Sequence, residues 1–247
     1  MIPVNGEERG NRFVGNMTKG QIVDDLRQAI LEERFEQGQS LVERELCEKY
    51  HVSRTPIREV LWRLVLDGVV EQRPSRGFFV RKLDWEQIFE LYQTREAVEG
   101  MAVRLCAQRG EPEVLQRFED MIRTLEELDV MANPRDGMQI GRAMHRLIME
   151  SSHNRFLHEY HEKIGYLARL ISNITIKAPT IEETSKQYHL TIMRAITRGD
   201  AERSETLMRE HLRITCRNVI KTFYPEVFGP GVFEGDSLAD ANLLGSA

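Results

Sequence analysis

The sequence predicts a mostly α-helical protein made of two domains. Amphipathic helices and one β-prone hairpin occupy residues 18–82, and six longer helical segments joined by short breaks fill residues 84–228. The composition, with 41% hydrophobic and 30% charged residues, is typical of a globular protein. A chain of 247 residues can bury a substantial core, and its length agrees with one or two domains.

The composition and the pattern of the N-terminus lead us to expect a cytoplasmic protein. No apolar run reaches the roughly 18 residues needed to cross a bilayer, and the N-terminus lacks the pattern of a secretory signal, so no membrane role is expected. Cys47, Cys106 and Cys216 lie far apart in helical apolar patterns, which favours buried, reduced thiols. Residues 1–17 and 229–247 are polar or small and aperiodic, and we expect a flexible arm and a flexible tail.

Three helices open the first predicted domain, residues 18–82. The first begins after Thr18, a plausible N-cap, and ends near Phe35. A short second helix spans 42–50, and a tight turn leads into the third. The third helix has an apolar stripe at three- and four-residue spacing and ends at a glycine, through Ile57, Val60, Leu61, Leu64, Val65 and Gly68.

The start of the third helix is polar and cationic. Ser53 or Thr55 can accept a hydrogen bond from an unpaired backbone N–H, and Pro56 is tolerated in a first turn. Arg54, Thr55 and Arg58 lie near this start, where the helix dipole and free N–H groups attract phosphate. The pattern predicts a helix whose N-terminal end contacts DNA while its apolar face packs inward.

A β-hairpin follows, with strands near 69–73 and 78–81 around a turn that ends in Arg76 and Gly77. Three helices and a hairpin make a winged helix-turn-helix, which inserts its second motif helix into the major groove. The chain has a net charge of −5, but residues 18–82 carry twelve Lys or Arg and eleven Asp or Glu, so this segment is +1 and the remainder −6. A small helical domain without a DNA partner is the alternative, and it would leave the arginines clustered without a role.

The first domain resembles the DNA-binding domain of the GntR family of bacterial transcription regulators. The resemblance covers about residues 22–83 and rests on the runs EREL (43–46), VSRTPIREVL (52–61) and RGFFV (76–80), together with Leu64, Asp67 and Gly68. It implies DNA contacts from the second helix, the start of the third helix and the wing tip, through Arg44, Ser53, Arg54, Thr55, Arg58, Arg76 and Gly77. Such arginines can hold phosphates or the O6 and N7 atoms of guanine.

The second domain, residues 84–228, is predicted to be an antiparallel bundle of about six helices. Breaks with helix-ending or capping residues separate the segments 84–108, 113–131, 136–152, 155–176, 181–198 and 201–223. This region resembles the FCD ligand-binding domain of the FadR subfamily. The resemblance rests on Leu91, Tyr92, Arg95, Glu99, Ala102, His145, Asn154, His189, Ala195, Asp200, Met208, His211 and Leu212.

The FCD resemblance implies a metal site formed by His145, His189 and His211. The family commonly has an Asp four residues before the first His, where this chain has Gly141, and an aromatic residue at the place of Met144. Three neutral imidazoles can hold Zn²⁺ or a similar divalent ion and leave a position open for water or a carboxylate. Without the family resemblance, a histidine on an inner helical face is more often a core residue, or a residue at a solvated edge, than a metal ligand.

Two other groups in the bundle have alternative interpretations. Arg95 either presents a cation to an anionic effector or forms an ordinary i,i+4 ion pair with Glu99. His158 and His161, at i,i+3 beside Glu162, have a spacing that can bind a metal, but their polar neighbours favour a solvated helix face.

Together these features predict a homodimeric regulator that binds palindromic double-stranded DNA. The resemblance implies a repressor of a catabolic operon, released by a small carboxylate effector bound in the helical domain. A metal-free activator is one alternative. A three-histidine metal hydrolase and an adaptor protein are others, but no GxSxG, HExxH or P-loop motif is present, and we expect no enzyme.

Overall fold

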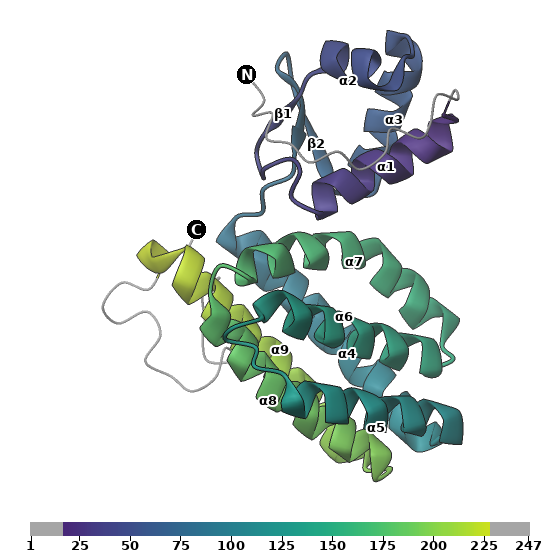
Figure 1. The fold of residues 1–247 in the computed structure, drawn as a ribbon, viewed down its shortest axis with the longest axis vertical. Helices are drawn as coiled ribbons and strands as arrows, with labels where there is room; N and C mark the ends of the chain where they lie inside the picture. The colour runs from purple at the N-terminus through teal and green to yellow at the C-terminus, as the bar shows by residue number, and fades with distance from the viewer. Residues whose placement is uncertain (1–16, 228–247) are drawn as a thin grey trace, which may run out of the picture. The chain divides into compact units, whose positions relative to one another are not determined.

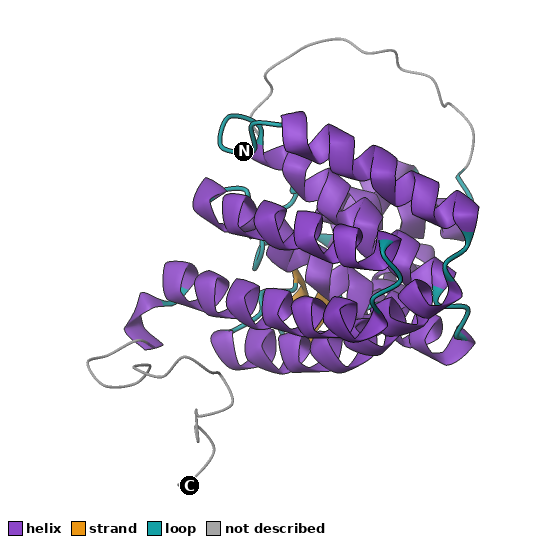
Figure 2. Ribbon diagram, turned by 90° about the horizontal axis from the view of Figure 1, so that it is seen from below, coloured by secondary structure: helices purple, strands orange, loops and turns teal. Residues whose placement is uncertain are grey.

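The computed structural model describes residues 17–227, which form two compact units that divide between Arg81 and Lys82. The unit before this division contains three helices and a small sheet, and the unit after it is helical (Figures 1 and 2). The predicted arm, apart from Met17, and the predicted tail lie outside the described residues.

The N-terminal unit begins with α1, Lys19–Leu31, where Thr18 and Gln21 cap the helix reciprocally. The helix ends four residues before the predicted Phe35, because Glu33 adopts a left-handed conformation with φ of 59°. α2, Glu43–Tyr50, ends at His51, which is also left-handed. α3, Arg54–Leu66, follows with only three residues between the two helices.

A three-stranded antiparallel sheet completes this unit. β2, Val70–Arg73, and β3, Gly77–Val80, form the predicted hairpin, with Arg73 opposite Gly77. β1, Ser40–Leu41, pairs with the other edge of β3 and was not predicted, because two residues are too few to show an alternating pattern. The unit packs around fully buried side chains from α1 and α3, including Ile22, Leu26, Ile30, Ile57, Leu61 and Leu64.

The C-terminal unit contains six α-helices within its described residues, so the predicted bundle is confirmed. They are α4 Trp85–Arg109, α5 Pro112–Glu127, α6 Pro134–Ser151, α7 Arg155–Thr175, α8 Pro179–Thr197 and α9 Ala201–Phe223, followed by the short 3-10 helix η1 Pro225–Val227. Three helices start one or two residues earlier than predicted, because a proline is accepted in the first turn. α5 ends earlier than predicted, since Leu128 has an extended backbone.

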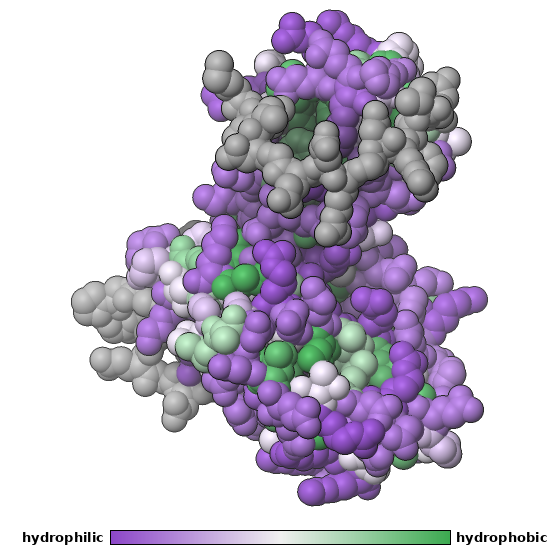
Figure 3. Space-filling model, in the orientation of Figure 1, coloured by the Kyte–Doolittle hydropathy of each residue, from purple (hydrophilic) through white to green (hydrophobic). Residues whose placement is uncertain are grey.

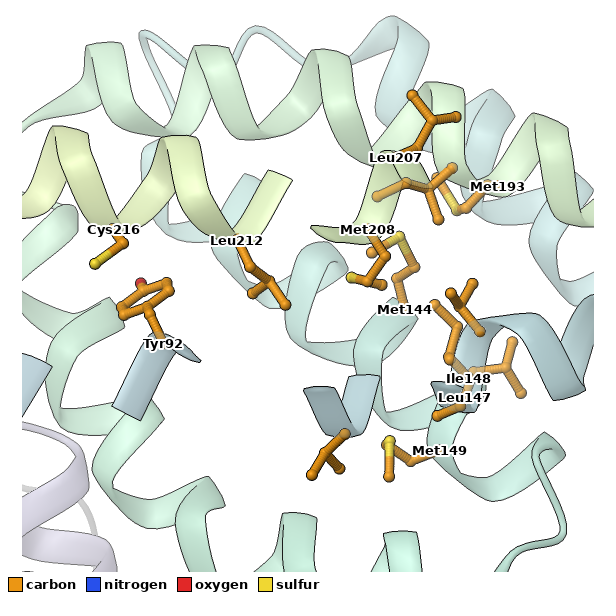
Figure 4. Packing of buried hydrophobic residues seen from close by; sticks show 14 of the residues in the cluster. Tyr92, Met144, Leu147, Ile148, Met149, Met193, Leu207, Met208, Leu212 and Cys216 are labelled. Atoms are coloured by element: carbon orange, nitrogen blue, oxygen red, sulfur yellow. The ribbon is translucent and has the colours of Figure 1, made fainter. Parts of the chain in front are cut away.

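The core of this bundle is rich in methionine and aliphatic side chains. Figure 4 shows Met144, Leu147 and Ile148 of α6 near Met193 of α8 and Met208 of α9, all of them buried. Polar residues dominate the visible surface, although apolar side chains are exposed in places on this unit (Figure 3).

Two further predictions concern the burial of the cysteines and helices that could cross a membrane. All three cysteines are free thiols, and Cys106 and Cys216 are buried as predicted, but Cys47 is only half-buried near the surface of α2. None of the described helices combines the length and apolar character needed to cross a membrane.

Candidate functional site

The start of α3 presents the side chains predicted to contact DNA. Arg54, Thr55 and Arg58 are all exposed, while Ile57 on the same helix is fully buried, so one face packs and the N-terminal end faces solvent. Ser53 occupies the N-cap position, but its side chain makes no capping hydrogen bond, and the predicted side-chain cap is therefore wrong. Its exposed hydroxyl lies at the helix start, where the backbone N–H groups attract anions.

Acidic side chains hold two of the arginines in the DNA-free protein. Arg58 Nε lies 3.1 Å from Glu43 Oε1, and Arg44 Nε lies 3.8 Å from Glu48 Oε1. Both arginines are well exposed, and exposed ion pairs contribute little to stability. Either guanidinium can therefore exchange its carboxylate for a phosphate at small cost.

The wing tip has the backbone that its glycine suggests. Gly77 has φ of 94°, a left-handed conformation that side chains disfavour, and Arg76 beside it is exposed. Arg73, by contrast, lies over the Phe79 ring at 4.3 Å and pairs with Glu71 at 2.6 Å. Of the two wing arginines, Arg76 is the one presented at the tip.

The three histidines predicted as metal ligands come together inside the C-terminal unit. His145 on α6, His189 on α8 and His211 on α9 each offer a nitrogen, and these nitrogens lie within 4.8 Å of one another. The Nε2 atoms of His189 and His211 are 3.2 Å apart. Two imidazole nitrogens bound to one tetrahedral Zn²⁺ lie roughly 3.3 Å apart, so the spacing of His189 and His211 fits a shared divalent ion.

The charge state of His189 and His211 also fits a metal. Burial, and then the neighbouring imidazoles and Arg95, hold the pKa of His189 and of His211 well below the usual range. Both rings are therefore neutral at pH 7, which is the form that binds metal. His161 on α7 also has a pKa lowered by burial, and it interacts with Glu99 and His145.

The prediction that His158 and His161 lie on a solvated helix face needs a correction. Both residues are half-buried rather than fully solvated, so the predicted solvated helix face does not describe them. Neither residue is grouped with the three clustered imidazoles in the described part of the chain.

Because Gly141 has no side chain, the His189 ring can occupy the space beside it. A Cβ atom at this position would lie 2.5 Å from Cε1 and 3.0 Å from Nδ1 of His189. An Asp at position 141 would therefore require the imidazole to move. The chain fits a ligand set of three imidazoles, without the carboxylate that the FCD resemblance implies at this place.

Glu99 on α4 was predicted only as a possible partner of Arg95, and its contact with the histidine cluster was missed. Its side chain is only 1% exposed, and its two oxygens lie 2.7 Å from Arg95 Nε and 2.6 Å from His145 Nδ1. The Arg95 guanidinium and the His145 imidazole outweigh the effect of burial and hold the pKa of Glu99 well below its usual value. Besides its i,i+4 spacing from Arg95, the sequence carried one signal that this side chain is buried, a glutamate within the apolar run between Val98 and Val103.

Arg95 forms the i,i+4 ion pair that was one of its two predicted roles. Its side chain is 12% exposed and its Nε donates to Glu99. Its guanidinium also lies 5.0 Å from the centre of the buried Tyr92 ring. The cation is therefore already compensated within the protein.

Comparison with known proteins agrees with both units. Residues 18–80 match the family described as bacterial regulatory proteins, gntR family, and residues 90–214 match the FCD domain. The chain belongs to the GntR family. This family comprises DNA-binding transcription regulators rather than enzymes, and the hydrolase alternative is thereby set aside.

Individual GntR relatives are distant but similar over most of their length. An uncharacterized HTH-type transcriptional regulator, YdhC of Bacillus subtilis, is 24% identical over 81% of this chain and 89% of its own. The HTH-type transcriptional repressor GlaR of Escherichia coli is 24% identical over 76% of this chain and 89% of its own. The crystal structure of a GntR regulator from Rhodococcus sp. RHA1 shares the fold, with a TM-score of 0.69 and 24% identity over 83% of this chain and 98% of that one.

Proposed function

We propose that this GntR regulator is a homodimeric repressor of a catabolic operon, released when a small carboxylate binds near a metal ion in the FCD domain. The observation that carries the proposal is the cluster of the imidazoles of His145, His189 and His211, the last two buried and neutral, in the domain that follows a winged helix-turn-helix in the sequence. The names of relatives such as GlaR, a transcriptional repressor, support the sign of regulation. Because DNA is its partner, we place the protein in the cytoplasm.

We assign DNA recognition to the N-terminal end of α3, with support from α2 and the wing. Arg54 and Arg58 are the residues whose loss is expected to matter most, with Arg44, Ser53, Thr55, Arg76 and Gly77 around them. A bidentate arginine contact with guanine discriminates by roughly 1–3 kcal/mol, which corresponds to a loss of affinity of about 5- to 150-fold.

Fluorescence anisotropy with the regulator's own upstream DNA tests this assignment. Arg54→Ala and Arg58→Ala should each weaken binding about tenfold or more at fixed salt. Arg63→Ala removes one exposed arginine from the last turn of the same helix and serves as the control. If the first two variants bind as tightly as the control, the recognition helix is assigned wrongly.

We propose that the three imidazoles hold Zn²⁺ or a related divalent ion. When bound, such an ion supplies a positive charge and an open position that attracts an anionic oxygen. Since Arg95 is already paired with Glu99, the carboxylate of the effector is proposed to bind at that open position rather than at Arg95.

Elemental analysis of protein purified without an affinity tag tests the metal. Near-stoichiometric metal is expected in the wild type and its loss in the His189→Ala/His211→Ala double variant. A thermal-shift screen of organic acids with and without metal then tests the effector. Metal-free protein that still responds to its effector would favour the alternative of a metal-free regulator, and stimulation of transcription would favour an activator.

The homodimer follows from the geometry of DNA. A palindromic operator with half-sites about one helical turn apart matches a two-fold symmetric protein, and two linked modules bind more tightly than one. Sedimentation equilibrium of the free protein should give twice the mass of 28.7 kDa. A monomer that binds a single half-site with the same affinity as the whole operator would contradict this part of the proposal.

A further inference from the structure

Glu99 lies between the two residues that the sequence assigned to different sites. Its Oε1 lies 2.7 Å from Arg95 Nε, one turn earlier on α4, and its Oε2 lies 2.6 Å from Nδ1 of His145 on α6. The Oε2 and Nδ1 atoms are both buried, and neither has a well-aligned hydrogen bond among the described residues. At this distance each atom is the available partner of the other.

The contact at Nδ1 determines which nitrogen of His145 is free. A neutral imidazole has one N–H donor and one lone pair, and a carboxylate partner accepts from the N–H. If Nδ1 carries the proton toward Glu99, the lone pair lies on Nε2. The ring is held against the other two, stacked on His211 with ring planes 27° apart and centres 5.4 Å apart, and edge-on to His189 at 5.4 Å.

The other two imidazoles already present Nε2. The Nε2 atoms of His189 and His211 face each other at 3.2 Å, and Nδ1 of His211 lies 3.4 Å from the Thr215 hydroxyl. A site in which all three histidines bind through Nε2 therefore requires His145 to be protonated on Nδ1. Glu99 is the carboxylate that favours this tautomer.

We propose that Glu99 is a positioning residue, which fixes the tautomer and orientation of His145 so that its Nε2 completes the three-imidazole metal site. This inference rests on the proposed metal site and adds a residue that does not itself touch the ion. Arg95 has a supporting role, because it holds the other oxygen of Glu99 and keeps the carboxylate in place. Gly141 provides no carboxylate, whereas Glu99 supplies one in contact with His145.

Zn²⁺ affinity, measured by competition with a chromophoric chelator, tests the proposal without DNA or effector. Glu99→Gln should bind Zn²⁺ about 10–100-fold more weakly than wild type, as is typical when an outer carboxylate on a ligating histidine is lost. Glu90→Gln, which changes an exposed glutamate of the same helix, should leave the affinity unchanged. A folded Glu99→Gln variant with wild-type affinity would overturn the proposal.

A second readout separates positioning from a merely structural role. In metal-free protein with ¹⁵N-labelled histidine, the imidazole nitrogens of His145 should show the proton on Nδ1, and Glu99→Gln should shift this tautomer equilibrium toward Nε2. The same tautomer in both proteins would also overturn the proposal. These spectra are recorded without Zn²⁺, so the metal itself cannot impose the result.

One variant guards against loss of folding. Glu99→Gln leaves Arg95 buried without its carboxylate, whereas Arg95→Met/Glu99→Gln removes both charges. If the single variant does not fold, the folded double variant should show the same loss of Zn²⁺ affinity, and wild-type affinity there would overturn the role of Glu99. Wild-type protein that binds no Zn²⁺ would instead overturn the proposed metal site itself, so the two failures are distinguishable.

Discussion

Gly141 shows how a single missing side chain shapes the proposed metal site. We expect Gly141→Ala to weaken Zn²⁺ binding, because its Cβ would lie 2.5 Å from Cε1 of His189 and displace the ring. The loss of affinity should be about tenfold or more, as is typical when a residue that orients a metal ligand is changed. The matched control is Gly165→Ala, a helical glycine of α7 whose added Cβ would meet nothing within 4 Å.

The control should keep its Zn²⁺ affinity and gain about 0.5–1 kcal/mol of stability, since alanine is the better helix former. Equal Zn²⁺ affinities for the two glycine variants, measured by chelator competition, would show that the His189 ring has room to move. The prediction from Gly141 would then be incorrect.

Glu182 on α8 gives the bundle a pH-dependent stability. Its carboxyl is buried, which raises its pKa above the usual value despite a 2.7 Å hydrogen bond from the Thr175 hydroxyl. A carboxyl with a raised pKa holds its proton longer in the folded state. Folding stability therefore falls as pH rises from 4.5, the usual value, through the folded pKa.

Glu182→Gln should remove this penalty, because an amide stays neutral and can still accept from Thr175. At pH 7.5 we expect the variant to have a higher Tm than wild type, by about 2–4 °C for each kcal/mol of folding stability that it gains. This difference in Tm should become smaller as the pH is lowered toward 4.5. Calorimetry at both pH values measures it. A variant less stable than wild type at pH 7.5 would show that the charged carboxylate is well compensated.

At the scale of elements, an ion pair links α1 to the C-terminal end of α3. Arg27 Nη2 lies 2.6 Å from Asp67 Oδ2, and the two side chains are only 15% and 11% exposed. Asp67→Asn should destabilise the N-terminal unit by about 1–3 kcal/mol, less than for a fully buried pair. Asp24→Asn is the matched control, because Asp24 also contacts Arg27 but is 74% exposed.

Urea denaturation of the two variants measures the difference. The Asp24 variant should lose less than about 1 kcal/mol, as exposed pairs do. Similar losses in both variants would mean that the Arg27–Asp67 contact does not hold α3 in place.

Elements also differ in how well their sequence predicted them. The helices of both units have strong periodicity, and their number and order in the described chain were predicted correctly. The end of α1 was predicted incorrectly, because the left-handed residue there is Glu33 and not a glycine, which would have indicated the end of the helix. β1 was missed since its two residues gain their strand structure only by pairing with β3.

At the scale of the whole molecule, each unit has its own core, and a ligand of one unit should stabilise that unit. Zn²⁺ at 100 times its Kd should add about 2.7 kcal/mol to the stability of the C-terminal unit. Calorimetry should show its transition moving upward while that of the N-terminal unit stays in place. The His189→Ala/His211→Ala variant should show no shift, and a shift there would place the metal elsewhere.

The sequence alone determined the architecture and the family, because hydrophobic periodicity and motif spacing are properties of neighbouring residues. It also selected His145, His189 and His211, although only through the family resemblance. The tertiary structure decided what surrounds them: that Arg95 is paired, that His189 fills the space above Gly141, and that Glu99 faces His145. The contact of His189 with Gly141 joins α8 to α6, and that of Glu99 with His145 joins α4 to α6; such distances in sequence leave no local pattern. The Arg95–Glu99 pair is local, and the sequence offered it as one of two roles, between which the structure decided.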